Sequence, residues 1–94
     1  MEMYNPAHPG KILKMGYLDE LNMSIAETAL KLGVSRQALY DLINEKSALT
    51  PVMALKIAKA FNSRPGLWMD LQTQYDLWHA KQTTNLDDVQ VITG

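Results

Sequence analysis

Apolar residues recur three and four positions apart along most of this chain, and that spacing is typical of amphipathic helices. Short segments that contain proline, glycine or polar residues separate the apolar stretches. The pattern predicts five helices, over residues 9–21, 25–32, 36–44, 51–61 and 65–81. We therefore predict an all-α fold in which residues 1–81 form one domain and residues 82–94 a short C-terminal tail.

Two short helices within residues 25–44 are joined by a tight turn. Gly33 can take the positive φ that a sharp helix end needs, and Ser35 can cap the helix that follows. Small Ala29 lies one helical turn before the glycine, while Leu39 and Leu42 share one face of the second helix. This arrangement predicts a helix-turn-helix.

The starts of the other helices also carry signals. Ser24 and Glu27 have the spacing of a capping box, and Thr50 followed by Pro51 is a cap with a first-turn proline. Residues 1–8 are predicted to be an irregular lead-in to helix one. Gly16 in helix one either allows close packing or is a tolerated weak position. Helix four is predicted to turn five residues inward: Ala54, Leu55, Ile57, Ala58 and Phe61.

Helix five is unusually rich in large apolar residues, at Leu67, Trp68, Leu71, Tyr75, Leu77 and Trp78. Its aromatic residues either complete the core or form a protein interface, where Trp and Tyr are enriched. We predict a homodimer contact on helix five and the tail, with Trp68, Leu71, Tyr75 and Trp78 at the dimer interface. Residues 89–92 alternate in polarity, so they are either a frayed end or a strand that pairs with a partner.

Composition argues for one folded, non-catalytic domain without a cofactor. The 94 residues are 47% hydrophobic and contain no cysteine, which excludes disulfides, thiolate metal sites and thiol nucleophiles. The two histidines, His8 and His79, lie at opposite ends of the chain without metal-ligand spacing. We predict a turn or capping role for His8 and a helix surface position for His79. No apolar run is long enough for a membrane span, and Glu2 argues against a signal peptide, so we expect a cytoplasmic protein.

Charge is distributed unevenly around a formal net value of −1. Residues 31–62 hold five Lys or Arg against two Asp or Glu, whereas residues 63–94 hold two against four. A basic middle and an acidic end suggest two different partners, and ordinary surface scatter is the alternative. The basic middle contains the helix-turn-helix, so DNA phosphates are the expected partner there.

The second helix of a helix-turn-helix presents its N-terminal residues to the major groove of DNA. We expect Ala38, Leu39 and Leu42 to form its buried face, which leaves five candidate DNA-binding residues: Ser35, Arg36, Gln37, Tyr40 and Asp41. Gln37 can pair bidentately with adenine, and Arg36 with guanine or a phosphate. Tyr40 can touch a thymine methyl group or a phosphate.

Asp41 carries a condition, and three further contacts are expected near this helix. Asp41 would repel phosphate unless it accepts from cytosine or orients Arg36 or Lys46. Asn44 and Lys46 lie where contacts to the DNA backbone are expected. Ser24 begins the preceding helix, whose first N–H groups can point at a phosphate. Helix-turn-helix units also occur in other helical proteins, so a protein-interaction module remains an alternative.

With these residues in view, the chain resembles the HigA family of antitoxins, part of the Xre or lambda-repressor-like group. The resemblance covers about residues 5–81. Its carriers are His-Pro-Gly-Lys-Ile-Leu at 8–13, the helix-turn-helix, Leu-Thr-Pro-Val-Met-Ala-Leu-Lys-Ile-Ala-Lys-Ala-Phe at 49–61 and Pro-Gly-Leu-Trp-Met-Asp-Leu-Gln-Thr-Gln-Tyr-Asp-Leu at 65–77. Lambda-like repressors often have glutamine at the start of helix two, where this chain has Ser24 and Ile25.

The resemblance implies a five-helix, lambda-repressor-like DNA-binding domain that dimerises on double-stranded operator DNA. It also implies binding of a HigB-type toxin, an mRNA endonuclease, and repression of the chain's own operon. Ser35, Arg36, Gln37, Tyr40 and Asn44 match operator-contacting positions of the family. The sequence leaves three hypotheses: an antitoxin, a transcriptional repressor with no toxin partner, and an interaction module with a vestigial helix-turn-helix.

Overall fold

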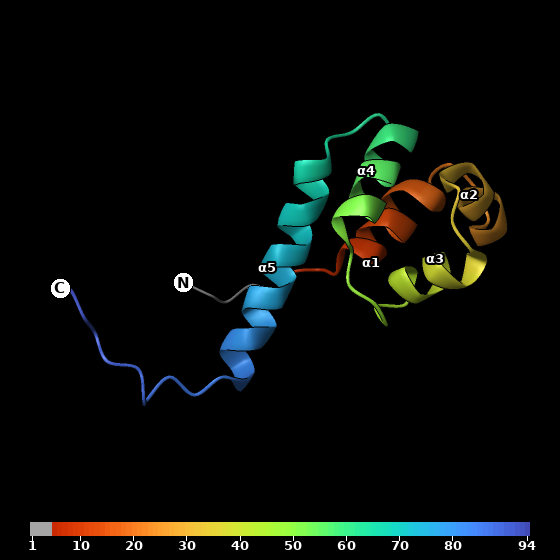
Figure 1. Cartoon of the computed structure of the whole chain (residues 1–94). Helices are drawn as coiled ribbons and strands as arrows, with labels where there is room; N and C mark the ends of the chain where they lie inside the picture. Colours follow the sequence, from red (N-terminus) through yellow and green to blue (C-terminus); the bar gives the residue numbers. More distant parts are fainter. Residues whose placement is uncertain (1–4) are drawn as a thin grey trace.

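The computed structural model describes residues 5–94, and it is helical, as the sequence predicts. Residues 1–4 lie outside the described residues, so Glu2 and the first half of the predicted lead-in are not assessed. No strand occurs between residues 5 and 94 (Figure 1). The helical elements are α1 (Pro9–Leu13), η1 (Lys14–Leu18), α2 (Ile25–Leu32), α3 (Arg36–Ile43), α4 (Pro51–Ala60) and α5 (Pro65–Thr83).

The first helix differs from the prediction of one α-helix over residues 9–21. After α1 the chain continues as a π-helical segment, in which the Asp19 N–H donates to the Lys14 carbonyl five residues back. The side chains of Lys14 and Asp19 form an ion pair across the same turn. This wider turn buries Leu13 and Leu18, which are five residues apart, and leaves Leu21 exposed in the following turn. Gly16 is exposed, and an added Cβ there would meet nothing within 4 Å, so it does not serve close packing.

The predicted caps are confirmed. The hydroxyl of Ser24 accepts from the Glu27 N–H at 3.0 Å, and that of Ser35 accepts from the Ala38 N–H at 3.0 Å. Thr50 caps α4 in the same way at 3.2 Å. Gly33 ends α2 in the left-handed conformation with φ 70°. These local signals fix where α2, α3 and α4 begin.

One apolar core joins all five helices. Its largest fully buried apolar side chains are Leu13, Leu18, Leu39, Leu42, Ile57 and Trp68. Two predicted inward residues are wrong: Ala38 is exposed on α3, and Leu55 is 59% exposed on α4. Each lies beside a buried residue, and helical rotation of about 100° per residue carries it out of the contact.

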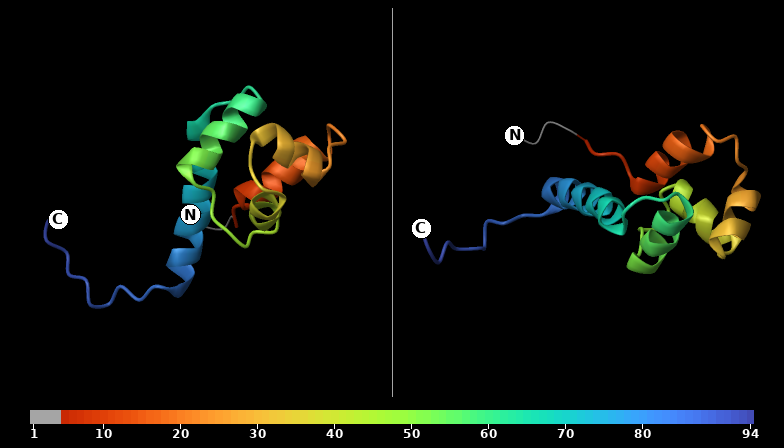
Figure 2. Two further views of the ribbon diagram at one scale, coloured as in Figure 1. Left: turned by 45° about the vertical axis from the view of Figure 1, so that its right-hand side comes forward. Right: turned by 90° about the horizontal axis from the view of Figure 1, so that it is seen from above.

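The first half of α5 packs against α4, and Tyr75 beyond its midpoint contacts His8 at the start of α1. The last turns of α5 and the tail lead away from the body (Figure 1). Trp68 is 1% exposed, and its indole N–H donates to the Ser63 hydroxyl at 2.9 Å. Leu67 and Leu77 are exposed. The tail from residue 84 extends away from the helices in every view (Figures 1 and 2). The radius of gyration is 16.0 Å, against about 12 Å for a compact chain of this length.

The tail exposes all of its apolar residues, Leu86, Val89, Val91 and Ile92. It forms neither helix nor strand in the isolated chain, so pairing of residues 89–92 with a partner stays a prediction. No helix within residues 5–94 is long and apolar enough to cross a membrane. Across the same residues, no group of three or more His, Asp or Glu side chains could hold a metal ion.

His8 caps α1 at a point where three elements meet. It is 3% exposed, and its Nδ1 accepts from the Gly10 N–H at 2.9 Å, which confirms the predicted capping role. Its ring meets the Tyr75 ring of α5 edge to face, with centroids 4.8 Å apart. Gly10 lies directly against the backbone of α3, because a Cβ built there would be 1.8 Å from the Leu42 carbonyl oxygen. Neutral His8 and Gly10 therefore hold α1 between α3 and α5.

Acid should destabilise this junction. Burial lowers the pKa of His8 below its ordinary 6.5, although Glu45, the Ser47 backbone and Asp76 act to raise it and His79 lowers it further. The unfolded chain therefore binds more protons at this histidine, so the free energy of unfolding falls as pH drops below about 6.5, by up to roughly 1.4 kcal/mol per pH unit. Urea unfolding at pH 7.5, 6.5 and 5.5 measures this loss.

Two variants make the pH prediction specific. His8→Asn keeps an N-capping side chain but cannot titrate, so its stability should change less between pH 7.5 and 5.5 than that of the wild type. His79→Gln removes the exposed histidine, which makes the smallest contribution to the lowered pKa of His8, and should keep most of the wild-type pH dependence. An equally steep loss in His8→Asn would contradict the assignment to His8.

Candidate nucleic-acid interface

The outer face of α3 gathers most of the predicted DNA-binding residues. Ser35, Arg36, Gln37 and Tyr40 are exposed, while Asp41 is half-buried. Leu39 and Leu42 on the opposite face are buried in the core and fix the helix against α1 and α2. An amphipathic helix of this kind presents a rigid polar surface to solvent.

Gln37 and Asp41 form a pair on this surface. The Gln37 amide Nε2 donates to Asp41 Oδ1 at 2.8 Å, one helical turn away. The sequence analysis offered three roles for Asp41, which were to accept from cytosine, to orient Arg36 or to orient Lys46. In the structure Asp41 accepts a hydrogen bond from Gln37 instead of pairing with either cation. The contact places Gln37 Nε2 beside the carboxylate, with the amide oxygen free to accept and a second amide hydrogen free to donate.

Tyr40, Asn44 and Lys46 form the C-terminal part of the face. The Lys46 ammonium lies 5.5 Å from the centroid of the Tyr40 ring, within cation–π range. The Asn44 amide donates to the Tyr40 carbonyl at 2.9 Å and so helps to end α3. Lys46 is thereby kept beside the helix in an exposed position.

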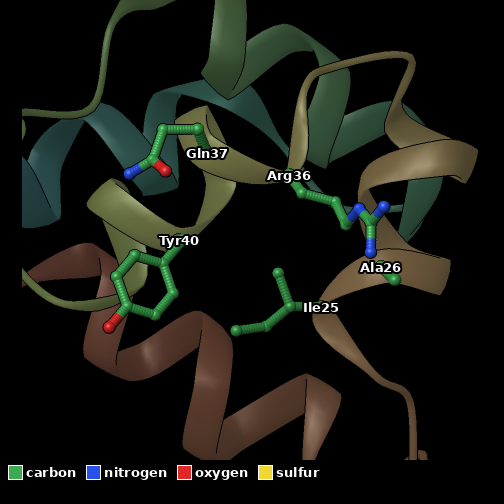
Figure 3. A pocket seen from close by; sticks show the side chains of 5 residues that line it. All are labelled: Ile25, Ala26, Arg36, Gln37 and Tyr40. Atoms are coloured by element: carbon green, nitrogen blue, oxygen red, sulfur yellow. The ribbon is translucent and has the colours of Figure 1, made fainter.

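The start of α2 lies beside the start of α3, and the two enclose an open hollow of about 450 Å³. Ile25 and Ala26 of α2 line it together with Arg36, Gln37 and Tyr40 of α3. Figure 3 shows the Ile25 side chain pointing into the hollow and the Arg36 guanidinium lying over Ala26, whereas the Gln37 amide points away. Ser24 caps α2 at the edge of this region.

The charges on this surface suit an anionic ligand. Arg36 and Lys46 are exposed cations, and the first residues of α2 and α3 line the same hollow. The N-terminus of a helix favours an anion through its free N–H groups and its dipole. The nearest carboxylate on the helix, Asp41, is hydrogen-bonded to an amide. The surface can therefore accept phosphates around its edge and hydrogen-bond to bases at its centre.

The four residues predicted at a dimer interface do not share one exposed face. Trp68 is buried in the core of its own chain, while Leu71, Tyr75 and Trp78 are half-buried along α5. Tyr75 lies between the rings of His8 and His79. The indole Nε1 of Trp78 is buried and has no hydrogen-bond partner among the described residues.

The sequence analysis missed two features of the structure, one at the α2–α3 surface and one beneath α5. Ile25 and Ala26 were assigned only to α2, yet they form one wall of the hollow. Gln72 of α5 was not singled out, yet it is buried and accepts from the Leu49 N–H at 2.7 Å. The sequence did contain a signal for this wall, because Ile25 and Ala26 are two apolar residues directly after the N-cap Ser24. Nothing in the local sequence marks the partner of Gln72, which lies 23 residues away.

Lys46→Ala should weaken binding to every duplex by a similar factor and leave base preference unchanged. A lysine that neutralises one phosphate releases about one counterion, so the slope of log K against log salt should fall by about one unit. Titrations of one duplex at four salt concentrations measure the slope. Lys59→Ala, exposed on α4, is the matched control. An unchanged slope for Lys46→Ala would remove Lys46 from the interface.

Comparisons with known proteins agree with this geometry. A family model described as helix-turn-helix matches residues 16–68. Virulence-associated protein A of Dichelobacter nodosus is 43% identical over 77 residues, which cover 81% of this chain and 76% of that protein.

Two solved structures are similar over nearly the whole chain. The antitoxin GraA in complex with its operator has a TM-score of 0.89 at 30% identity, covering 97% of this chain and 95% of that chain. The Pseudomonas aeruginosa antitoxin HigA with the higBA promoter has a TM-score of 0.84 at 30% identity, covering 94% of this chain and 99% of that chain. The likeness therefore includes α5 as well as the helix-turn-helix.

Proposed function

Because this chain belongs to the helix-turn-helix family of Xre-like proteins, we propose that it is a transcriptional repressor that binds duplex operator DNA. The observation that carries the proposal is the exposed face of α3, where a rigid helix presents Arg36, Gln37 and Tyr40 beside the N-terminus of α2. Two similar structures are antitoxins held on an operator or a promoter, which supports the same role here.

In this proposal each residue contacts either a base or the DNA backbone, according to its position on the surface. Gln37 reads a base edge, and Arg36 pairs with a guanine or a phosphate. Ser35 and the N-terminus of α2 at Ser24 bind phosphates through N–H and hydroxyl groups. Asp41 orients the Gln37 amide, and Asn44 and Lys46 lie over the DNA backbone.

We further propose that the protein acts as a homodimer. Two half-sites about 34 Å apart would strengthen binding by a single small module. Leu71, Tyr75 and Trp78 on α5, with the exposed apolar tail, are the proposed contact surface. Trp68 contributes to this surface only by holding α5 in place.

The finer proposal is that the protein is an antitoxin that binds and neutralises a HigB-type toxin. The HigA and GraA structures support it, because they resemble this chain beyond the helix-turn-helix. A repressor with no toxin partner is the second candidate, favoured by the fact that the site described here explains DNA binding alone. The acidic C-terminal third, with four Asp against one Arg and one Lys, offers a surface for a basic partner.

Two experiments test these proposals separately. Selection of duplexes from a random pool by the purified chain should yield one recurring, palindromic sequence, whereas an unenriched pool would contradict the repressor. Co-expression with the product of the neighbouring gene should give a complex that purifies together and lacks the toxicity of that product. Operator binding without such a complex would favour the repressor with no toxin.

A further inference from the structure

The hollow between α2 and α3 is apolar where the surrounding surface is polar. Ile25, Ala26 and the Tyr40 ring supply carbon atoms to its walls, and Arg36 and Gln37 lie at its rim (Figure 3). A phosphate would lose its hydration against these walls, whereas it is well placed on Arg36 and at the helix N-termini outside them. The hollow therefore suits an apolar group that belongs to a polyanion.

Duplex DNA offers one such group on its major-groove edges, the 5-methyl group of thymine. We propose that the hollow receives a thymine methyl group of the operator and that Ile25 is a specificity-determining residue for that base. The inference rests on the proposed DNA-binding function and deepens it. It gives the start of α2 a role in reading bases as well as in binding phosphate.

The surroundings of Ile25 make it suitable for this contact. It is half-buried against the core, and its β-branched side chain has restricted χ1 rotation, so its position is well fixed. Tyr40, on the opposite wall, lies near Lys46, whose ammonium is 5.5 Å from the ring centroid. The Gln37 amide points away from the hollow and is held by Asp41, so it can read a neighbouring base independently.

The test uses the duplex that the full-length wild-type chain selects from random DNA, with each thymine replaced in turn by deoxyuridine, which lacks only the methyl group. One replacement in each half-site should weaken wild-type binding roughly fourfold, the factor for losing one buried methyl-sized group, and the others should have little effect. In Ile25→Ala the same replacement should have a clearly smaller effect, because only Ala26 and the Tyr40 ring remain as apolar walls. Leu30→Ala, exposed on the outer face of α2, should respond like the wild type.

The outcomes separate this inference from the proposed function. Far-UV circular dichroism of Ile25→Ala, with Ile25→Val as the milder variant, verifies that the chain is folded during the titrations. A selected site without thymine, equal binding of all deoxyuridine duplexes, or an undiminished deoxyuridine effect in Ile25→Ala would overturn the role of Ile25 while DNA binding stands. Selection of no sequence at all would instead contradict the proposed function, and this inference with it.

Discussion

Gly10→Ala is expected to lower the free energy of unfolding by about 3 kcal/mol, at the upper end of the usual range for overpacking a core. A Cβ at this position would lie 1.8 Å from the Leu42 carbonyl oxygen and 2.6 Å from its carbon. These atoms belong to the backbone of α3, so no side-chain rotation relieves the clash, and α1 and α3 must separate. For a domain of this size the melting temperature should fall by roughly 12–24 °C.

Urea unfolding followed by circular dichroism measures the effect, and Gly16→Ala is the matched control. Gly16 lies in η1, and a Cβ there meets nothing within 4 Å, so the substitution should be neutral or slightly stabilising. Because Gly10 supports the end of α3, Gly10→Ala should also weaken DNA binding at temperatures where it remains folded. Equal stabilities for the two variants would contradict the close approach of α1 to α3.

Gln37→Ala is expected to weaken binding to the selected duplex by roughly 1–3 kcal/mol and to relax preference at one base position. The loss has two sources. The amide no longer hydrogen-bonds to a base, and the Asp41 carboxylate, which accepts from Gln37 at 2.8 Å, loses its partner beside the DNA. Competition titrations with the four base-pair variants of each position measure affinity and preference together.

A second variant separates the two sources. Gln37→Ala with Asp41→Ala removes the freed carboxylate, so it should recover part of the affinity but none of the base preference. Gln74→Ala replaces an exposed glutamine of α5 and should change neither. If Gln37→Ala kept the wild-type preference at every position, Gln37 would not be a base-reading residue.

Much of the fold followed from local chemistry. Caps at Ser24, Ser35 and Thr50, and the glycine at 33, each act within a few residues, so the sequence alone places α2, α3 and α4. The predicted HigA resemblance and the all-α, helix-turn-helix fold are likewise confirmed. Helix five was predicted to end at 81 and ends at Thr83, where the tail begins without a glycine or proline stop.

What the sequence did not predict depends on contacts between distant segments. The π-helical turn η1 allows Leu13 and Leu18 to be buried together. A regular α-helix would place these two residues on different sides of the helix. The close packing of Gly10 on α3 and of the His8 ring on Tyr75 joins segments more than 30 residues apart, whereas the local cap made by His8 was predicted. For the site, the exposed residues of α3 were predicted from the sequence. The hydrogen bond between Gln37 and Asp41 and the position of Ile25 in the wall of the hollow became visible only in the three-dimensional structure.

Sequence-specific binding through α3 is the central claim, and one equilibrium comparison tests it most directly. The wild-type chain is titrated with its selected duplex and with a scrambled duplex of equal length and composition, at one fixed salt concentration. We expect the selected duplex to bind at least about 10³-fold more tightly, as specific binders do, and Gln37→Ala to reduce that ratio. Equal affinity for the two duplexes would contradict the claim.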